Sequence, residues 1–185
     1  LRNDVKIIEF TATPDGTIYD LMNWGDNAKK IKMEPGQGYT SCFDLKNQQR
    51  VFQYKDLCGY DKKTGEIDKK IVSDNITEIK YYIDNYKSPK YHIIRTSNGN
   101  MSDLVIHNFK TVFGQNIIYK TYDKDSDLDD INKILYITPQ KHTFIFIKEK
   151  LRCAKTLYKK YLGIIYERYT KFPDDAVIIQ GLIGR

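Results

Sequence analysis

The chain has 185 residues, 41% of them hydrophobic, which suits one ordinary domain or one domain and part of another. Its 30 lysines and arginines exceed its 24 acidic residues, but the two kinds are mixed along the chain, so the net charge of +6 only mildly favours a polyanionic partner. Cys42, Cys58 and Cys153 form no CxxC pair, and no run approaches the ~20 apolar residues of a membrane span, so the sequence indicates a soluble intracellular protein without a disulfide framework.

The first 74 residues have an irregular texture. A short apolar strand is predicted at residues 5–10, and it runs directly into the loop-forming sequence TATP at residues 11–14. Residues 24–70 contain too many glycine and aspartate breaks for a long helix, so we expect loops with short elements there.

From residue 75 on, strand-like and helix-like segments alternate. Apolar residues at helical spacing predict a helix over residues 75–86, and a buried type of strand follows at residues 91–96. The next helix is expected at residues 101–114, with Ser102 as its N-cap and Gly114 at its end. The remaining predicted elements are, in chain order, a strand at 116–122, a capped helix at 126–136, a strand at 142–148, a loop entering a helix at 149–162, a strand at 163–169, and a strand that breaks into a helix at 176–185. This alternation predicts an α/β protein with a parallel sheet.

In such a sheet, function gathers at the carboxyl ends of the strands, in the loops that lead to the next helix. The stretches at these positions are RTSNGN at residues 95–100, KEKLRCAKT at 148–156 and QGLIGR at 180–185. Arginine and hydroxyl groups in two of them suit contacts to phosphate.

Four stretches resemble motifs of superfamily-two helicases and related translocases. TATP resembles the motif that closes their first RecA-like lobe, and QGLIGR resembles the QxxGR core of their last motif. YHIIRTS at residues 91–97 and FIFIKEKLRCAKTL at 144–157 resemble the strands and loops that open the second lobe and precede the last motif. The resemblance covers essentially the whole chain, tightly from His92 on and loosely in residues 15–71, and is closest to viral or plasmid helicases and the helicase-like Z1 ATPases.

This resemblance implies a RecA-like three-layer α/β sandwich with a mainly parallel sheet, preceded by an irregular segment. Residues 1–74 would hold the end of the first RecA-like lobe and an irregular connecting segment. Residues 75–185 would form the second lobe, truncated at its end. The implied activity is that of an ATP-dependent helicase or translocase, an NTP hydrolase of viral replication or transcription.

In motors of this kind, ATP and Mg²⁺ lie between two lobes, and the second lobe supplies positive charge when the lobes close. The resemblance assigns that charge to Arg185, and it lets Gln180 touch the γ-phosphate or orient water. Gly184 would allow the backbone to approach closely, and Thr11 and Thr13 would couple the nucleotide state to lobe movement. The alternative is a surface arginine at a helix start, a capped polar side chain and turn-forming hydroxyls.

A nucleic-acid track is implied for two of the strand-end loops, with DNA favoured over RNA. Phosphate backbones are bound by guanidinium, ammonium, hydroxyl and exposed amide groups. The residues assigned to this track are Arg95, Thr96, Ser97, Lys148, Arg152, Lys155 and Thr156. The alternatives are a loop that caps the following helix and a solvated basic helix start.

The chain departs from the family pattern at several points. Relatives often have a glycine in place of Ala154 and an acidic residue near Lys155, and the chain stops before the second arginine of the last motif, so which arginine contacts phosphate stays open. No GxxxxGK[ST] loop occurs, and no acidic Mg²⁺ site precedes TATP. We therefore expect the chain to be part of a longer protein whose first RecA-like lobe binds ATP. If viral, it would act in the cytoplasm or nucleus of a host cell, with packaging in the virion as an option.

A second hypothesis is a catalytically inactive helicase-like module that binds nucleic acid or a protein partner. Metal chemistry is disfavoured, because His92, His107 and His142 are isolated in the sequence and lack zinc-ligand spacing. Several aromatic residues have the chemistry to stack on bases, although core packing is the favoured interpretation. These residues are Trp24, Tyr81, Tyr82 and Tyr86.

Overall fold

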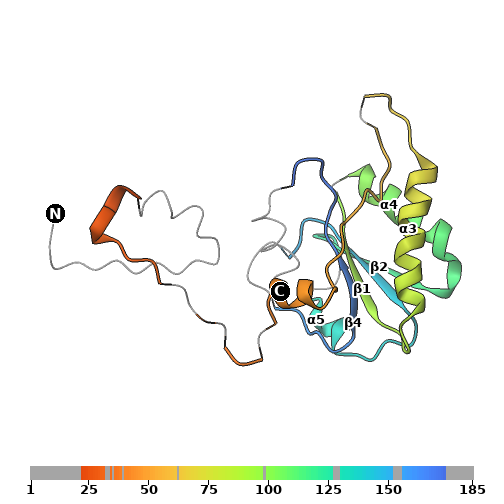
Figure 1. Ribbon diagram of the computed structural model, residues 1–185. Helices are drawn as coiled ribbons and strands as arrows, with labels where there is room; N and C mark the ends of the chain where they lie inside the picture. Colours follow the sequence, from red (N-terminus) through yellow and green to blue (C-terminus); the bar gives the residue numbers. More distant parts are fainter. Residues whose placement is uncertain are drawn as a thin grey trace.

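The computed structural model describes residues 22–31, 34, 36–38, 40–61, 63–97, 99–126, 130–151 and 156–173. Within these residues, one four-stranded sheet has the strand order β2-β3-β1-β4, and all of its pairings are parallel. Its strands are β1 (Tyr91–Arg95), β2 (Ile118–Tyr122), β3 (Thr143–Ile147) and β4 (Leu162–Tyr166). Helices lie against both faces of this sheet (Figure 1), so the expected three-layer α/β class is confirmed.

The two central strands are buried along almost their whole length because both faces of the sheet are covered. Every residue of β3, with the sequence TFIFI, is buried, and so are the first four residues of β1. Parallel sheets favour such continuous runs of β-branched and aromatic residues. Arg95 pairs with Ile147 in register, so β1 and β3 end at the same level.

Two long helices cover one face of the sheet. The helix α3 (Lys69–Asp84) is capped by Asp68, whose carboxylate accepts a hydrogen bond from the Ile71 amide at 3.0 Å. Its neighbour α4 (Asn100–Phe113) places Phe109 against two rings of β3, with centroid distances of 4.8 Å to Phe144 and 5.4 Å to Phe146. These contacts build the larger of the two cores.

The opposite face of the sheet is covered by a short helix and a loop. The helix α5 (Asn132–Leu135) and the segment around Leu157 pack on Ile93 and Ile145. Asn132 holds this segment through its side chain, which donates to the Thr156 carbonyl and accepts from the Tyr158 amide, both at 2.9 Å. The described residues between 156 and 161 are loop and turn, so the helix predicted within 149–162 is wrong for that part.

Two predicted helix boundaries are also corrected. The helix predicted to start at residue 75 begins at Lys69, because Asp68 supplies the cap before the apolar stripe starts. Ser102 is not the N-cap of α4. The N-cap position is Gly99, and the Ser102 hydroxyl is buried 2.9 Å from the hydroxyl of Thr96. Gly114, with φ of 68°, ends α4 as predicted and opens the 3₁₀ turn η2 (Gly114–Asn116).

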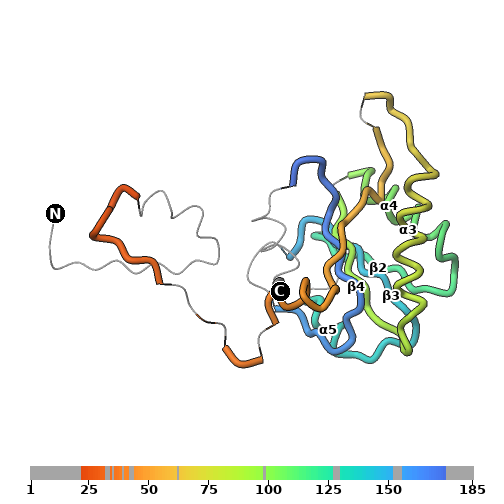
Figure 2. The backbone as a smooth tube through the Cα atoms, in the orientation of Figure 1, coloured from red at the N-terminus to blue at the C-terminus, as the bar shows by residue number. Residues whose placement is uncertain are grey.

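The first part of the chain contains loops with short elements, as expected. These elements are the 3₁₀ turn η1 (Gly25–Asn27) and the helix α2 (Cys42–Asn47), whose capping box joins Ser41 and Asp44. After α2 the chain runs alongside β4 and α3 (Figure 2), where Leu57 is buried and the Tyr166 hydroxyl donates to the Lys55 carbonyl at 3.0 Å. This segment therefore packs on the same body as the sheet. Across the described ranges, no helix combines the length and apolar character needed to cross a membrane.

Candidate functional site

The loops that follow β1 and β3 lie side by side at the carboxyl edge of the sheet. The Thr96 amide donates to the Ile147 carbonyl at 3.0 Å, and the Lys148 amide donates to the Tyr122 carbonyl at 3.2 Å. The ladder therefore extends one residue beyond each strand before the loops diverge. Two stretches that sequence analysis singled out, at 95–100 and 148–156, thus start next to each other.

Arg95 links three of the strand-end loops. Its Nη2 donates to the Leu151 carbonyl at 2.8 Å, in the loop after β3. Its Nε lies 3.5 Å from Oε1 of Glu167, the first residue after β4, and the two side chains are only 15% and 7% exposed. The same Glu167 oxygen accepts the Arg168 amide at 2.9 Å. Arg95 therefore fixes the shape of this edge as well as carrying its charge.

Glu167 was missed by sequence reasoning. The available signal was an acidic residue directly after the fourth predicted strand, on the same edge as an arginine after the first. One of its oxygens, Oε2, is buried and makes no hydrogen bond to the described residues. Burying a carboxylate oxygen without a hydrogen bond costs free energy.

The loop after β3 has an unusual backbone. Glu149 and Leu151 have φ of 57° and 59°, in the left-handed region that residues other than glycine seldom adopt. Leu151 is held by burial of its side chain, and the Lys150 ammonium lies over the Tyr122 ring, 4.4 Å from its centroid. Residues in such conformations concentrate at functional sites, where the surrounding structure holds them in place.

The structure describes three further residues of the predicted nucleic-acid track beside Arg95 and Thr96. Ser97 and Lys148 are half-buried at the carboxyl edge, and Thr156 is exposed on the second face of the sheet. Thr96 is only 4% exposed, and its hydroxyl bonds to Ser102 and to the Ile147 carbonyl. A direct phosphate contact by the Thr96 hydroxyl would have to replace these internal bonds. Nucleic-acid contact stays a prediction for all five residues.

The other predicted site residues lie outside the described residues, and their roles stay predictions. They are Thr11, Thr13, Arg152, Lys155, Gln180, Gly184 and Arg185.

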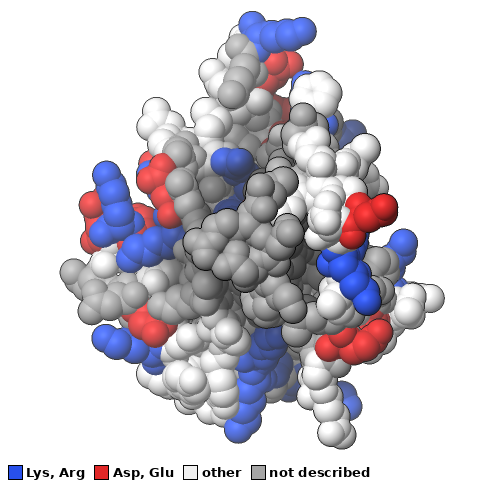
Figure 3. Space-filling view, turned by 90° about the vertical axis from the view of Figure 1, so that its left-hand side faces the viewer, with Lys and Arg blue, Asp and Glu red and all other residues white. Residues whose placement is uncertain are grey.

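In the face of the molecule shown in Figure 3, lysine and arginine side chains are interspersed with acidic ones. That distribution matches the mixed charge pattern of the sequence.

At the opposite, amino edge of the sheet, two histidines that are distant in sequence form a pair. Nε2 of His92 lies 3.0 Å from Nδ1 of His142, and Nδ1 of His92 accepts the Ile164 amide at 3.1 Å. His92 is therefore the Nε2–H tautomer and donates to His142. Burial lowers the pKa of His92 to about 3, with a smaller contribution from His142.

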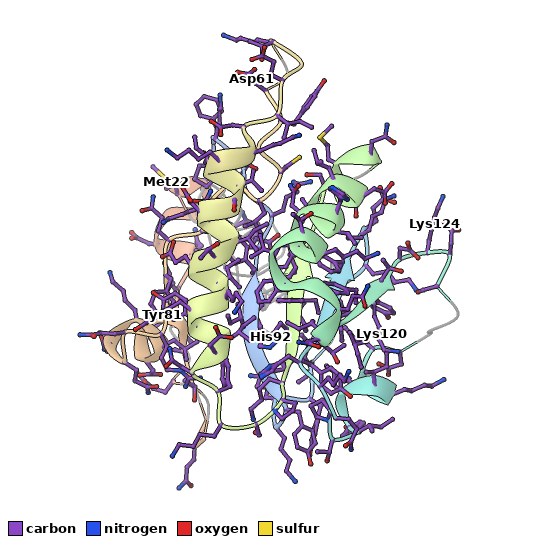
Figure 4. The ribbon with its side chains drawn as sticks, turned by 90° about the vertical axis from the view of Figure 1, so that its right-hand side faces the viewer. Met22, Asp61, Tyr81, His92, Lys120 and Lys124 are labelled. Carbon is purple, nitrogen blue, oxygen red and sulfur yellow. The ribbon has the colours of Figure 1, made fainter. Side chains whose placement is uncertain are left out.

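His92 and His142, which are isolated in the sequence, form a pair in the folded protein. The contacts of this pair indicate a role in packing and hydrogen bonding rather than in metal binding. His92 lies under the lower ends of α3 and α4 (Figure 4), and a Cβ on Gly163 would meet its ring at 2.6 Å. Both nitrogens of His92 are already engaged. In the parts of the chain that the structure describes, no group of three metal-ligating side chains occurs.

Comparison with known proteins finds a viral relative. The chain is 32% identical over 189 residues to the uncharacterized protein L594 of Acanthamoeba polyphaga mimivirus, a match that covers 96% of the chain. The chain spans 42% of the length of that relative. No family model matches the chain, and no solved structure matches it.

Proposed function

We propose that this chain is the C-terminal RecA-like lobe of an ATP-dependent nucleic-acid helicase or translocase of viral type. The observation that carries the proposal is the pair of adjoining loops after β1 and β3, each with a helicase-like motif, at the carboxyl edge of a parallel sheet. This is the edge where open α/β sheets bind their ligands. The similarity to a protein of a giant virus supports the viral setting.

In this proposal the carboxyl edge is a rigid platform for phosphate contacts. Arg95 and Glu167 hold the loops in place, while Lys148 and Ser97 present an ammonium group and a hydroxyl group beside them. ATP and Mg²⁺ are bound mainly by a first lobe, and Arg185 adds positive charge to the γ-phosphate when the lobes close. Charge that develops on the phosphoryl oxygens makes such an arginine worth a factor of about 10³–10⁵ in rate. The protein would act in the cytoplasm or nucleus of an infected cell.

The test is nucleic-acid-stimulated ATP hydrolysis by the complete protein, compared with its Arg185→Ala variant. We expect stimulation by single-stranded DNA in the wild type and a loss of at least about 100-fold in kcat for the variant, with ATP binding retained. Lys141→Ala is the matched control, because it removes one exposed positive charge at the amino edge of the sheet. An Arg185→Ala variant with unchanged kcat would reject the assignment of Arg185.

A second candidate function is a catalytically inactive module that binds nucleic acid. It is favoured by the internal engagement of Arg95 and Thr96, whose polar groups bond to the loops and helices around them. Strand binding by the complete protein without any stimulated hydrolysis would support this candidate over the motor.

A further inference from the structure

A groove on the flank of the molecule has a size that suits a small organic group. It has a volume of about 460 Å³ and lies between the segment that follows α2, the outer side of α3 and the edge strand β4. Figure 4 shows α2 and the chain after it lying beside α3 on the side away from α4. Cavities of about 300–1,000 Å³ with mostly apolar walls are typical of ligand sites.

Aromatic rings form much of the wall and rim of this groove. Phe52 and Tyr82 line the groove with tilted rings whose centroids are 4.7 Å apart, and the ring of Tyr81, which is not a lining residue, lies 5.6 Å from that of Tyr82. Phe52 is 57% exposed and Tyr81 is 68% exposed. Tyr166 and Tyr86 also line the groove. Exposed rings gathered at a cavity are the arrangement that stacks bases of a single strand.

Polar groups of two kinds accompany the rings. The side-chain amides of Gln49 and Gln53 belong to groove-lining residues and have no internal hydrogen bond within the described chain. Amides both donate and accept, which suits the edges of nucleobases. Arg50 lines the groove too, and its only described side-chain bond is a long one of 3.4 Å to Gln48. Its guanidinium group is thus available for a phosphate beside a bound base.

We propose that this groove, lined by Phe52, Tyr82, Gln49, Gln53 and Arg50, binds an unstacked base of single-stranded nucleic acid. A strand is the occupant that uses all of these features. One base enters the cavity, its neighbour stacks on the exposed rim rings, and Arg50 meets the intervening phosphate. The net charge of +6 favours the same polyanion. The site goes beyond the function proposed above, because it lies on the flank of α3 and needs neither ATP nor Arg185.

The test is fluorescence anisotropy of the complete protein with a labelled oligothymidylate of about 12 nucleotides, a length within the usual site sizes. An abasic strand of the same length keeps the phosphates and lacks the bases. We expect the abasic strand to bind about tenfold more weakly, because stacking contributes about 1–3 kcal/mol per base. Phe52→Leu and Tyr82→Leu should lower affinity for the thymidine strand to the abasic level and leave abasic binding unchanged.

Tyr136→Leu is the matched control, since Tyr136 is 63% exposed at the end of α5 and outside the groove. It should bind both strands like the wild type. Free thymidine, added up to concentrations near the Kd of the strand, distinguishes a pocket that binds a free nucleoside from one that requires a strand, and the proposal expects no competition in this range. Displacement of the strand by such low concentrations of free thymidine would overturn the choice of a strand as occupant.

Equal affinity for the thymidine and abasic strands would overturn the proposal, and so would unchanged affinity in Phe52→Leu. Phe52 is more than half exposed, so this variant should fold, and its urea unfolding curve checks that it does. The outcome is separable from that of the motor proposal. Arg185→Ala tests hydrolysis alone, whereas the strand comparison is made without nucleotide.

Discussion

Arg95 is the residue on which the shape of the carboxyl edge depends. Replacing it with alanine leaves the Glu167 carboxylate, which is 7% exposed, without the cation beside it and frees the Leu151 carbonyl. Breaking a buried ion pair by removing one partner is strongly destabilising, so we expect Arg95→Ala to lower the free energy of unfolding by about 3 kcal/mol. Urea denaturation followed by circular dichroism measures this change.

The control for this prediction is an exposed ion pair. Lys80 and Asp84 form an i,i+4 pair at 3.0 Å on the surface of α3, with side chains 41% and 61% exposed. Solvent screens such pairs, so Lys80→Ala should cost less than about 1 kcal/mol. Similar losses in the free energy of unfolding for the two variants would mean that the buried Arg95 contact stabilises the fold no more than the exposed Lys80 pair does.

His92 gives the fold a dependence on pH. Its pKa is lowered to about 3 by burial, against an ordinary value of 6.5, and burial also lowers the pKa of His142. Between these two pH values the unfolded chain takes up a proton that the folded protein excludes. The free energy of unfolding should therefore fall as the pH drops from about 6.5 towards 3, by up to about 1.4 kcal/mol per pH unit for His92.

The measurement is urea denaturation at several pH values for the wild type, His92→Leu and His107→Leu. His92→Leu should flatten the slope between pH 6.5 and 4, whatever it does to the overall stability. His107 is exposed on α4, so its replacement should leave the slope as it is. An unchanged slope in His92→Leu would show that other groups control acid unfolding.

At the scale of elements, Gly59 determines how the chain enters α3. Its φ is 69°, and an added Cβ would lie 2.3 Å from Val72 Cγ2 and 2.9 Å from the carbonyl oxygen of Asp68, the N-cap residue. Gly65 also has a positive φ, of 75°, but a Cβ there would meet nothing within 4 Å. Comparing alanine substitutions at the two glycines therefore distinguishes the cost of backbone strain, present at both, from the cost of a steric clash, present only at Gly59.

We expect Gly65→Ala to lower the free energy of unfolding by about 1 kcal/mol, the cost of a left-handed backbone for a residue with a Cβ. Gly59→Ala should cost about 2 kcal/mol more, because the methyl group overpacks a well-filled site. Thermal and urea unfolding of both variants measure the difference. Equal losses would show that the loop moves away from Val72 without penalty.

The elements that sequence could predict are those whose own pattern specifies them. The sequence shows the continuous apolar run TFIFI of β3 and the apolar residues at helical spacing in α3 directly. Gly114 ends α4 where expected. Two of the errors arise where a side chain outside the predicted helix determines the local structure. Ser102 does not cap its helix because Thr96 takes its hydroxyl, and the segment at Thr156 is not helical because Asn132 bonds to its backbone.

The candidate site shows the same division. Sequence placed Arg95 and Lys148 at the correct edge, because parallel strands end together and the loops follow at once. It could not find the link from Arg95 to Glu167 or the pair of His92 and His142, since each joins residues at least 50 positions apart. Contacts between residues so far apart form only in the folded chain, and the pattern of neighbouring residues in the sequence does not predict them.

At the scale of the whole molecule, charge and topology together decide what the carboxyl edge can bind. The net charge of +6 comes from basic and acidic residues that are mixed along the chain, so under the proposed function it would attract a nucleic-acid strand without selecting a binding site. Under the same proposal the parallel sheet would define that site, because it brings the loops after β1 and β3 together. A lysine at that junction should contact phosphate, whereas a lysine elsewhere should only add to the general field.

Lys148 and Lys141 test this distinction, because they flank opposite ends of β3. Affinity of the complete protein for a single strand is measured by anisotropy at a series of salt concentrations. Each phosphate contact contributes about 0.7 to the slope of log affinity against log salt, so Lys148→Ala should flatten the slope by about that amount. Lys141→Ala should leave the slope nearly unchanged. If both variants flatten it equally, the strand is held by net charge, and the carboxyl edge has no defined phosphate contact at Lys148.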